Sequence, residues 1–321
     1  MRGFLEEVVA GFGGTWDFMV GGGIDHYGKL SAMGNFEISA VGGGAGTVKD
    51  GLDHAAAMWN PEGDMGNMEA WEMIEPFLYL GRGVMASSAG MGRHRGGSGF
   101  ESMRFLSKTN NWVVMNMGEG HFLSFAGIFG GYPAASGYRH NAHNTNYNEF
   151  IMGEKLYPER DYSTEDSLLK KRVTGDFVFD QNCNYVAYPY KEGDFHSSFL
   201  RGAPGLGDPL ERKPEAVIDD LKGGYLLERF VSTVYGVIAN KRDDDWIIDR
   251  ERTIKRREEI REERRAKSIP TREWMNKERE RVKEKNFIQP IKDMYASSMS
   301  LSPKFATKFR SFWELDEEFT F

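Results

Sequence analysis

The chain has 321 residues, which is long enough to bury a sizeable hydrophobic core without disulfides or structural metal ions. Its formal net charge of -7 argues against nucleic acid as the main partner, because phosphate binding needs clustered positive charge. The single cysteine, Cys183, excludes an intramolecular disulfide, and no apolar run approaches the roughly 18 residues of a membrane span, so we expect a cytoplasmic protein.

Glycine and methionine are concentrated in the first part of the chain. Residues 1–150 hold 29 of the 38 glycines and 12 of the 16 methionines. Short apolar runs in this part, such as 111–117 and 121–129, are interrupted by glycine. Glycine allows positive φ angles and close approach of backbones, so the pattern is typical of short strands, bulges and tight loops. We predict an irregular, β-rich region.

Residues 53–72, DHAAAMWNPEGDMGNMEAWE, combine a histidine, several carboxylates and a turn-forming Asn-Pro-Glu-Gly sequence. His54 with Asp50, Asp53, Glu62 and Asp64 could supply nitrogen and oxygen ligands to a metal ion. Their spacing matches no known metal-binding loop, and the EF-hand pattern is absent. The spacing therefore gives no reason to assign a metal site to this chain.

A second polar candidate is the basic, glycine-rich stretch SSAGMGRHRGGSGFES at 87–102. Backbone N–H groups of its glycines and the guanidinium groups of Arg93 and Arg95 could jointly hold a carboxylate or phosphate. The alternative is a tight β-hairpin whose arginines pair with neighbouring acids, and composition alone favours that alternative.

Two further motifs bear on metals and nucleotides. His140 and His143 lie three residues apart in RHNAHNTN, but without the glutamate and apolar helical face of a zinc-binding helix. We interpret this stretch as a polar loop with incidental histidines. Neither Gly-x-x-x-x-Gly-Lys-Ser/Thr nor Gly-x-Gly-x-x-Gly occurs, so ATP, if it is used, is expected on another chain.

From about residue 208 the pattern becomes helical. Pro214 suits a first helical position and Gly223 a helix end, with an apolar stripe of Val217, Ile218 and Leu221 between them. A second stripe, formed by Leu227, Phe230, Val231 and Val234, predicts a helix packed against the first. The sequence thus predicts an α+β fold, with a glycine-rich β-containing region over 1–207 and a helical C-terminal region over 208–321.

Residues 241–285 carry 17 Lys/Arg against 13 Asp/Glu. Because charges of both signs alternate at helical spacing and aromatic residues are scarce, we favour a solvated helix over an RNA-binding surface. After Pro270 a further helix is predicted, with Thr271 as its cap and Trp274, Met275 and Val282 as its buried face. The aromatic tail FRSFWELDEEFTF is expected to pack against the rest of the chain.

Five stretches, at 52–72, 75–102, 130–146, 201–237 and 268–280, occur in one order and together resemble the C-terminal half of the hydantoinase B/oxoprolinase family. The sequences GDPLER at 207–212 and PEAV at 214–217 are hallmarks of that family. The sequences WNPEGDMG at 59–66 and GGYPAASGYR at 130–139 are similar to its acetone carboxylase branch.

The resemblance implies ATP-dependent carboxylation of acetone, or a related small ketone, by bicarbonate to a β-keto acid. It also implies a partner β subunit similar to hydantoinase A that binds ATP, and a small γ subunit. The His-x-x-Asp-x-His stretch that holds Mn²⁺ in the upstream half of such subunits has no match here. We therefore expect a C-terminal piece of a split or truncated subunit, inactive alone, with Mn²⁺ and ATP on other chains or on the missing half.

On this interpretation residues 60–63 form a turn, anchored by Trp59 and Trp71, that borders the substrate cavity or a subunit interface. His54, Glu62 and Asp64 become the candidates for cavity-facing polar groups, although a purely structural role for all three remains open. Two alternatives to the carboxylase also remain: a subunit of an ATP-dependent hydantoinase or 5-oxoprolinase type hydrolase, and a non-catalytic structural subunit.

Overall fold

The structure is a computed structural model. It describes residues 8–11, 17–35, 41–55, 66–118, 125–151, 153, 173–180, 187–243 and 245–321. The chain divides into two compact units, Met1–Arg257 and Glu258–Phe321. Helices and strands are mixed in sequence order, and the predicted α+β class is confirmed. After the last strand of the large sheet, the described residues form helices and one β-hairpin from Pro209 onward.

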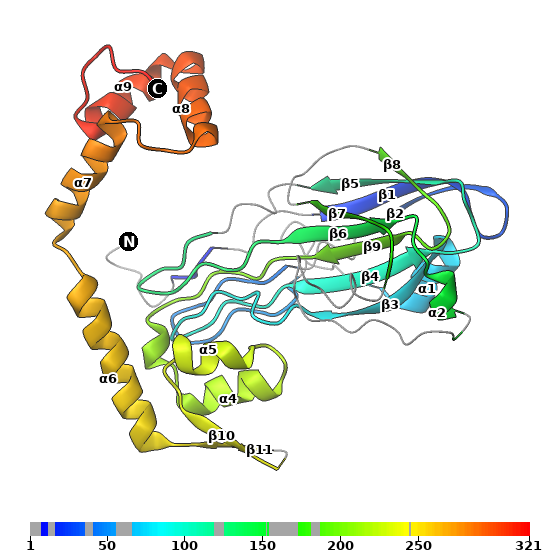
Figure 1. Ribbon diagram of the computed structural model, residues 1–321, viewed down its shortest axis with the longest axis horizontal. Coiled ribbons are helices and arrows are strands. Elements are labelled where there is room, and N and C mark those ends of the chain that lie inside the picture. The colour runs from blue at the N-terminus through cyan, green and yellow to red at the C-terminus, as the bar shows by residue number, and fades with distance from the viewer. Residues whose placement is uncertain are drawn as a thin grey trace. The chain divides into compact units, whose positions relative to one another are not determined.

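The described residues of the first unit form two larger antiparallel sheets and one two-stranded sheet (Figure 1). The five-stranded sheet has the order β3(Phe77–Val84)-β4(Phe100–Leu106)-β9(Phe195–Phe199)-β6(Tyr138–His143)-β7(Asp176–Asp180). The four-stranded sheet has the order β2(Leu30–Asn35)-β1(Asp17–Ile24)-β5(Trp112–Gly118)-β8(Ala187–Tyr190). Strand β5 confirms the strand predicted over 111–117. In the other predicted run, residues 121–124 lie outside the described residues, and 125–129 forms no strand.

An apolar cluster joins the two sheets. Because side chains alternate between the two faces of a strand, Phe100 and Leu106 of β4, which are six positions apart, lie on the same face. They pack with Trp112 and Val114 of β5, all four being buried in one hydrophobic cluster. This cluster is the core of the first unit and fixes which faces of the sheets are turned inward.

A band of polar side chains is buried beside that cluster. Arg104 of β4 donates from Nη1 to the Tyr79 hydroxyl at 2.7 Å, and the same hydroxyl donates to Glu75 Oε1 at 3.0 Å. In His196 of β9, the Nε2 atom lies 2.8 Å from Asn116 Oδ1, and the Nδ1 atom lies 3.4 Å from Arg104 Nη2. Burial, and then the charge of Arg104, hold the pKa of His196 well below its ordinary value. The neutral imidazole therefore donates to Asn116 and accepts from Arg104.

Glycines allow several extended segments to pack backbone against backbone. We call these segments, residues 41–55, 85–99, 125–137 and 200–208, the glycine-rich bundle. Gly97 donates its N–H to the Gly43 carbonyl at 2.8 Å, and its own carbonyl accepts from the N–H of Ala203 at 2.9 Å. A Cβ atom on Gly97 would lie only 1.8 Å from the Leu52 carbonyl oxygen. The close spacing of these backbones thus excludes any side chain at this position.

The helical part of the first unit begins at η3(Pro209–Glu211), followed by α4(Pro214–Lys222) and α5(Glu228–Thr233). Helix α4 begins at Pro214 and has Gly223 at its C-cap, as predicted. The apolar faces of α4 and α5 share one core cluster, which also contacts the hairpin β10(Ala239–Arg242)–β11(Asp245–Ile248). Two short helices, α1(Met68–Ile74) and α2(Asn148–Ile151), complete this unit among the described residues. Trp71 lies in α1, whereas Trp59 and the predicted turn at 60–63 lie outside the described residues.

Helix α6(Arg250–Lys267) begins in the first unit and ends in the second. The second unit also contains α7(Thr271–Lys283), α8(Gln289–Leu301) and α9(Pro303–Trp313). Most of α6 is exposed, which confirms the solvated helix. Two details of α7 were predicted wrongly, because Thr271 is its first residue rather than its cap and Trp274 is 48% exposed. Over the part of the chain that the structure describes, no helix combines the length and apolar character that crossing a membrane requires.

The second unit has its own small aromatic core. Val282, Met299, Ala306 and Phe309 are buried together, and the tail residues Phe319 and Phe321 pack against them. The expected packing of the aromatic tail is confirmed. One turn of α9 shows the contrast between its faces, since Phe309 is buried and Phe312 is 60% exposed.

Replacing Phe309 with alanine is expected to destabilise the second unit by about 3 kcal/mol, because the substitution leaves a cavity among packed rings. Phe312→Ala removes an exposed ring of the same kind and is expected to cost less than about 0.5 kcal/mol. Urea unfolding followed by tryptophan fluorescence, with Trp274 and Trp313 as reporters, measures both. Equal losses for the two variants would contradict the packing described for α9.

Candidate functional site

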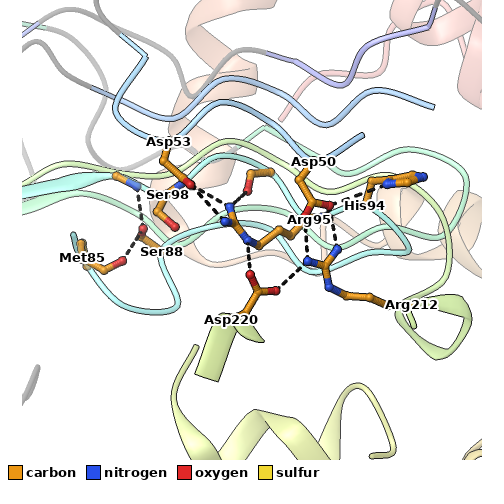
Figure 2. Close-up of polar contacts among 11 residues, drawn as sticks. Asp50, Asp53, Met85, Ser88, His94, Arg95, Ser98, Arg212 and Asp220 are labelled. Atoms are coloured by element: carbon orange, nitrogen blue, oxygen red, sulfur yellow. Dashed lines mark hydrogen bonds and ion pairs between the residues drawn. The ribbon is translucent and has the colours of Figure 1, made fainter. Parts of the chain in front are cut away.

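The candidate site is a series of ion pairs between two largely buried arginines and three aspartates, two of which are partly exposed (Figure 2). Its centre is Arg95, whose side chain is 11% exposed. Arg95 donates from Nη1 and Nη2 to the two carboxylate oxygens of Asp53, at 2.7 and 3.0 Å. It donates from Nε to Asp220 Oδ1 at 2.9 Å and from Nη1 to the Gly96 carbonyl at 2.9 Å. The planar guanidinium is thus held by two carboxylates from opposite sides.

Asp220 of α4 links Arg95 to a second buried arginine. Arg212, which follows η3, donates from Nη2 to Asp220 Oδ2 at 2.7 Å. It also donates from Nη1 and Nη2 to the two oxygens of Asp50, both at 2.7 Å. We call the series Asp53–Arg95–Asp220–Arg212–Asp50 the ion-pair chain. It connects the bundle segments 41–55 and 85–99 to the first helix of the helical part.

Burial and pairing act in opposite directions on the carboxyl groups. Burial raises the pKa of Asp50, but the hydrogen bonds and charge of Arg212 outweigh burial, so that pKa lies below its ordinary value. Burial also raises the pKa of Asp53, but the hydrogen bonds and charge of Arg95 lower it, and the pKa of Asp53 lies below its ordinary value. Burial also lowers the pKa of His94, whose Nδ1 lies 3.7 Å from Asp50 Oδ1. At neutral pH the two carboxyl groups are therefore ionised and His94 is neutral.

The lowered pKa values of Asp50 and Asp53 predict a dependence of stability on pH. A carboxyl group whose pKa is lower in the folded than in the unfolded chain contributes its full stabilisation above the unfolded value, about 3.9. This contribution is lost as pH falls through the folded value. We expect the urea midpoint of the wild-type chain to fall more steeply below about pH 4 than that of the Asp50→Asn, Asp53→Asn double variant. Parallel curves for the two proteins would contradict this assignment.

Other contacts hold the loop that carries Arg95. Ser88 Oγ donates to the Met85 carbonyl at 2.6 Å and accepts from the Gly99 N–H at 2.8 Å, so both ends of the loop are tied together (Figure 2). The guanidinium carbon of Arg95 lies 4.8 Å from the centre of the Tyr225 ring, within the range of cation–π attraction. These contacts orient Arg95 before any partner or ligand is present.

The predicted cavity candidate His54 lies next to the ion-pair chain. Its φ of +48° is unusual for a residue other than glycine, and its N–H donates to the Ser98 carbonyl at 3.1 Å. The imidazole stands edge-on to the Phe100 ring, and its buried Nε2 atom has no hydrogen-bond partner among the residues that the structure describes. Burial lowers the pKa of His54, against the charge of Asp53, so the ring is neutral at neutral pH. Glu62 and Asp64, the other two candidates, lie outside the described residues.

The two arginines predicted to bind an anion differ in their surroundings. The donors of Arg95 are taken up by carboxylates of the chain itself, as described above. Arg93 is 44% exposed, and its Nη1 lies 3.7 Å from Glu211 Oε2. The strands flanking this loop, β3 and β4, pair antiparallel, but they are joined by residues 85–99 rather than by a tight turn. An external anion at Arg95 would therefore have to displace Asp53 or Asp220.

A cavity of about 570 Å³ lies elsewhere in the first unit. Its walls include Tyr79, Phe105 and Tyr147, with Lys108 and the carboxylates Glu72 and Glu192 among its other lining residues. His54, Arg93 and Arg95 do not line it. The polar residues singled out from the sequence and this cavity are thus separate features of the fold.

The interpretation of residues 139–146 as a polar loop was wrong for its first part. Tyr138–His143 forms β6, which lies inside the five-stranded sheet between β9 and β7. Pairing with two strands that are distant in sequence buries this segment in spite of its polar composition. Because His140 and His143 are three residues apart on a strand, they point to opposite faces and cannot bind one metal ion together.

The residues that the structure describes were also compared with the requirements of a metal site. Among them no three His, Cys, Asp or Glu side chains come together in a way that could hold a metal ion. A stable protein site for a cation such as Mn²⁺ uses several oxygen or nitrogen ligands at once. These residues therefore do not fit the Mn²⁺ that the family resemblance implies.

Comparison with known proteins shows extensive similarity. Residues 2–209 match the family model for hydantoinase B/oxoprolinase. The chain is 44% identical to the acetone carboxylase alpha subunit of Xanthobacter autotrophicus, over 99% of this chain and 42% of that protein. It is 27% identical to the acetophenone carboxylase delta subunit of Aromatoleum aromaticum, over 75% of this chain and 35% of that protein.

Solved structures give the same relationship. The nucleotide-free structure of an acetone carboxylase superimposes with a TM-score of 0.88 at 44% identity, over 99% of this chain and 42% of that chain. The ATP-dependent caprolactamase of Pseudomonas jessenii has a TM-score of 0.58 at 19% identity, over 78% of this chain and 38% of that chain, which shows a shared fold alone. The chain thus spans less than half the length of each of these relatives.

Proposed function

Because the chain belongs to the hydantoinase B/oxoprolinase family, we propose that it forms a segment of an ATP-dependent ketone carboxylase subunit. The observation that carries this proposal is the similarity to an acetone carboxylase alpha subunit, which extends over nearly the whole chain in both sequence and structure. The more distant curated relative is also a carboxylase subunit. The proposed reaction joins acetone, or a related small ketone, to bicarbonate to give a β-keto acid, which is carbon–carbon bond formation of the ligase type.

In this proposal the chain contributes a rigid wall and an interface rather than the phosphate-handling groups. Activated bicarbonate and activated ketone react with water, so the site that joins them must exclude it. The glycine-rich bundle packs backbones too closely for water to enter between them, and the ion-pair chain fixes the bundle to α4. These features support a structural part in a closed site, and we do not expect the chain to be active alone.

The proposed assembly includes further chains. ATP is assigned to a β subunit similar to hydantoinase A, because neither phosphate-binding glycine motif occurs in this sequence. Mn²⁺ is assigned to another part of the assembly, and a small γ subunit completes it. We propose the cytoplasm as its location, which the single cysteine supports.

Reconstitution tests the proposal. The chain is purified alone and together with the hydantoinase A-like and small subunits, and each preparation receives ATP, bicarbonate and acetone. We expect the β-keto acid from the complex, and none from the chain alone or from the complex without this chain. Ring opening of 5-oxoproline or hydantoin without ketone carboxylation would replace the proposal with a hydrolase. A complex inert towards all these substrates would leave a structural subunit.

A further inference from the structure

A second polar constellation, outside the ion-pair chain, is built around Asp194. This residue is buried in the turn between β8 and β9. Its carboxylate accepts the backbone N–H of Asn144 at 2.7 Å and that of Lys191 at 2.9 Å. Two backbone donors fix the position of this carboxylate.

The third partner of this carboxylate is a histidine. His143, the last residue of β6, lies with Nδ1 3.1 Å from Asp194 Oδ2. A carboxylate oxygen accepts hydrogen bonds, so this contact places a proton on Nδ1, and the lone pair of the base form of the imidazole is then on Nε2. The ring also stands edge-on to Tyr190, with centroids 4.8 Å apart, which fixes its plane.

The Nε2 atom of His143 is left available. The side chain is 19% exposed, and Nδ1 makes the only hydrogen bond recorded for the ring among the described residues. The other two histidines of this sheet differ from it. Both ring nitrogens of His196 are engaged, by Asn116 and by Arg104, and His140 is buried against Phe177.

A carboxylate that orients Nδ1–H of an imidazole and leaves Nε2 open is the arrangement of a general base. We propose that His143 and Asp194 form a proton-transfer pair that acts on the ketone. This inference rests on the proposed function, which requires a carbon atom next to the carbonyl group to lose a proton before it can attack the bicarbonate carbon.

The step balances on the groups named. The C–H bond next to the carbonyl breaks and its electron pair forms the C=C bond of the enolate, while the carbonyl π pair moves onto oxygen. The proton forms a new N–H bond at His143 Nε2, and the resulting imidazolium is stabilised by the ionised Asp194. The imidazolium then returns the proton to solvent, which restores the base for the next turnover.

The first test needs no turnover. Diethyl pyrocarbonate acylates an imidazole nitrogen that is unprotonated and accessible, and mass spectrometry locates the label. In the assembled complex we expect label on His143 and none on His140 or His196, with less label when acetone is present. His143 that stays unlabelled in the folded complex would overturn the proposal, because no substrate could then reach Nε2.

The second test follows the proton itself. In D₂O the complex is expected to exchange the methyl protons of acetone, and His143→Gln should slow both exchange and kcat by about 10²- to 10⁴-fold, with little change in KM. Asp194→Asn should lower both rates less, by loss of orientation. His140→Gln, on the opposite face of the same strand, is the matched control and is expected to keep the wild-type rates.

The outcomes separate this inference from the proposed function. A His143→Gln complex that exchanges and carboxylates at the wild-type rate would overturn the inference and leave the carboxylase intact. A wild-type complex that neither exchanges nor carboxylates acetone would overturn the proposed function, and the role of His143 in ketone chemistry with it, whatever the labelling shows.

Discussion

Substituting Asp220 with alanine is expected to lower the free energy of unfolding of the chain by about 5 kcal/mol, at the upper end for a broken buried ion pair. The effect is large because one carboxylate serves two buried guanidinium groups. Its removal takes one hydrogen bond from Arg95 and one from Arg212, whose guanidinium groups are largely buried. Each arginine keeps one aspartate, so the chain still folds but with two under-paired charges.

Asp219→Ala is the matched control, since Asp219 precedes Asp220 on the same helix and is exposed. We expect it to change the free energy of unfolding by less than about 0.5 kcal/mol. Urea unfolding at pH 7, followed by circular dichroism, measures the wild type and both variants. If Asp220→Ala unfolds at the same urea concentration as Asp219→Ala, the contacts of the ion-pair chain contribute nothing to the stability of the fold.

The other large effect is expected at Gly97. An alanine methyl group there would lie 1.8 Å from the backbone carbonyl oxygen of Leu52, about half the distance of an ordinary contact. A backbone atom cannot move aside by a side-chain rotation, so the two bundle segments must separate and lose the hydrogen bond between Gly97 and Gly43. We expect Gly97→Ala to cost about 4 kcal/mol or more.

Gly83→Ala provides the comparison. Gly83 lies in β3, and a Cβ atom there would meet nothing within 4 Å. The same chemical change is expected to be neutral or to stabilise the chain by about 0.4–1 kcal/mol, because alanine has less freedom to lose on folding. Thermal unfolding and the yield of folded protein distinguish the two variants. Similar behaviour of both would show that the bundle is packed more loosely than described.

Local signals in the sequence were sufficient for part of the fold. Pro214 and Gly223 mark the ends of α4 because their backbone preferences act within a few residues. The short apolar run at 111–117, which is typical of short strands, bulges and tight loops, forms β5. The strand at His140 was missed because its burial comes from pairing with β7 and β9, which no local pattern encodes. Glycine content indicated close backbones, but not which segments they would join.

The candidate site shows the same division. Arg95 was a candidate from the sequence because glycines flank it. Asp53 lies in the carboxylate-rich stretch that was considered as a source of metal ligands. Asp220 is 125 residues from Arg95, and in the sequence it is one of several acids on a helix with an apolar face. The only sign in the sequence that the Asp220 side chain is buried is its position next to the apolar stripe of α4. Arg212 fell inside a family motif, GDPLER, without any indication of its partner.

The polar band between the two sheets has a consequence for the alignment of the strands. Arg104 stands directly opposite His196 in the pairing of β4 with β9. If the register of β9 shifted by two residues, each side chain would still point to the same face of the sheet. In a purely apolar interior such a shift would cost little free energy. The shift would, however, separate the buried imidazole from both Arg104 and Asn116, and losing hydrogen bonds in a buried site costs free energy. We infer that these few polar atoms specify the register of β9 against β4, because apolar packing alone would allow several registers.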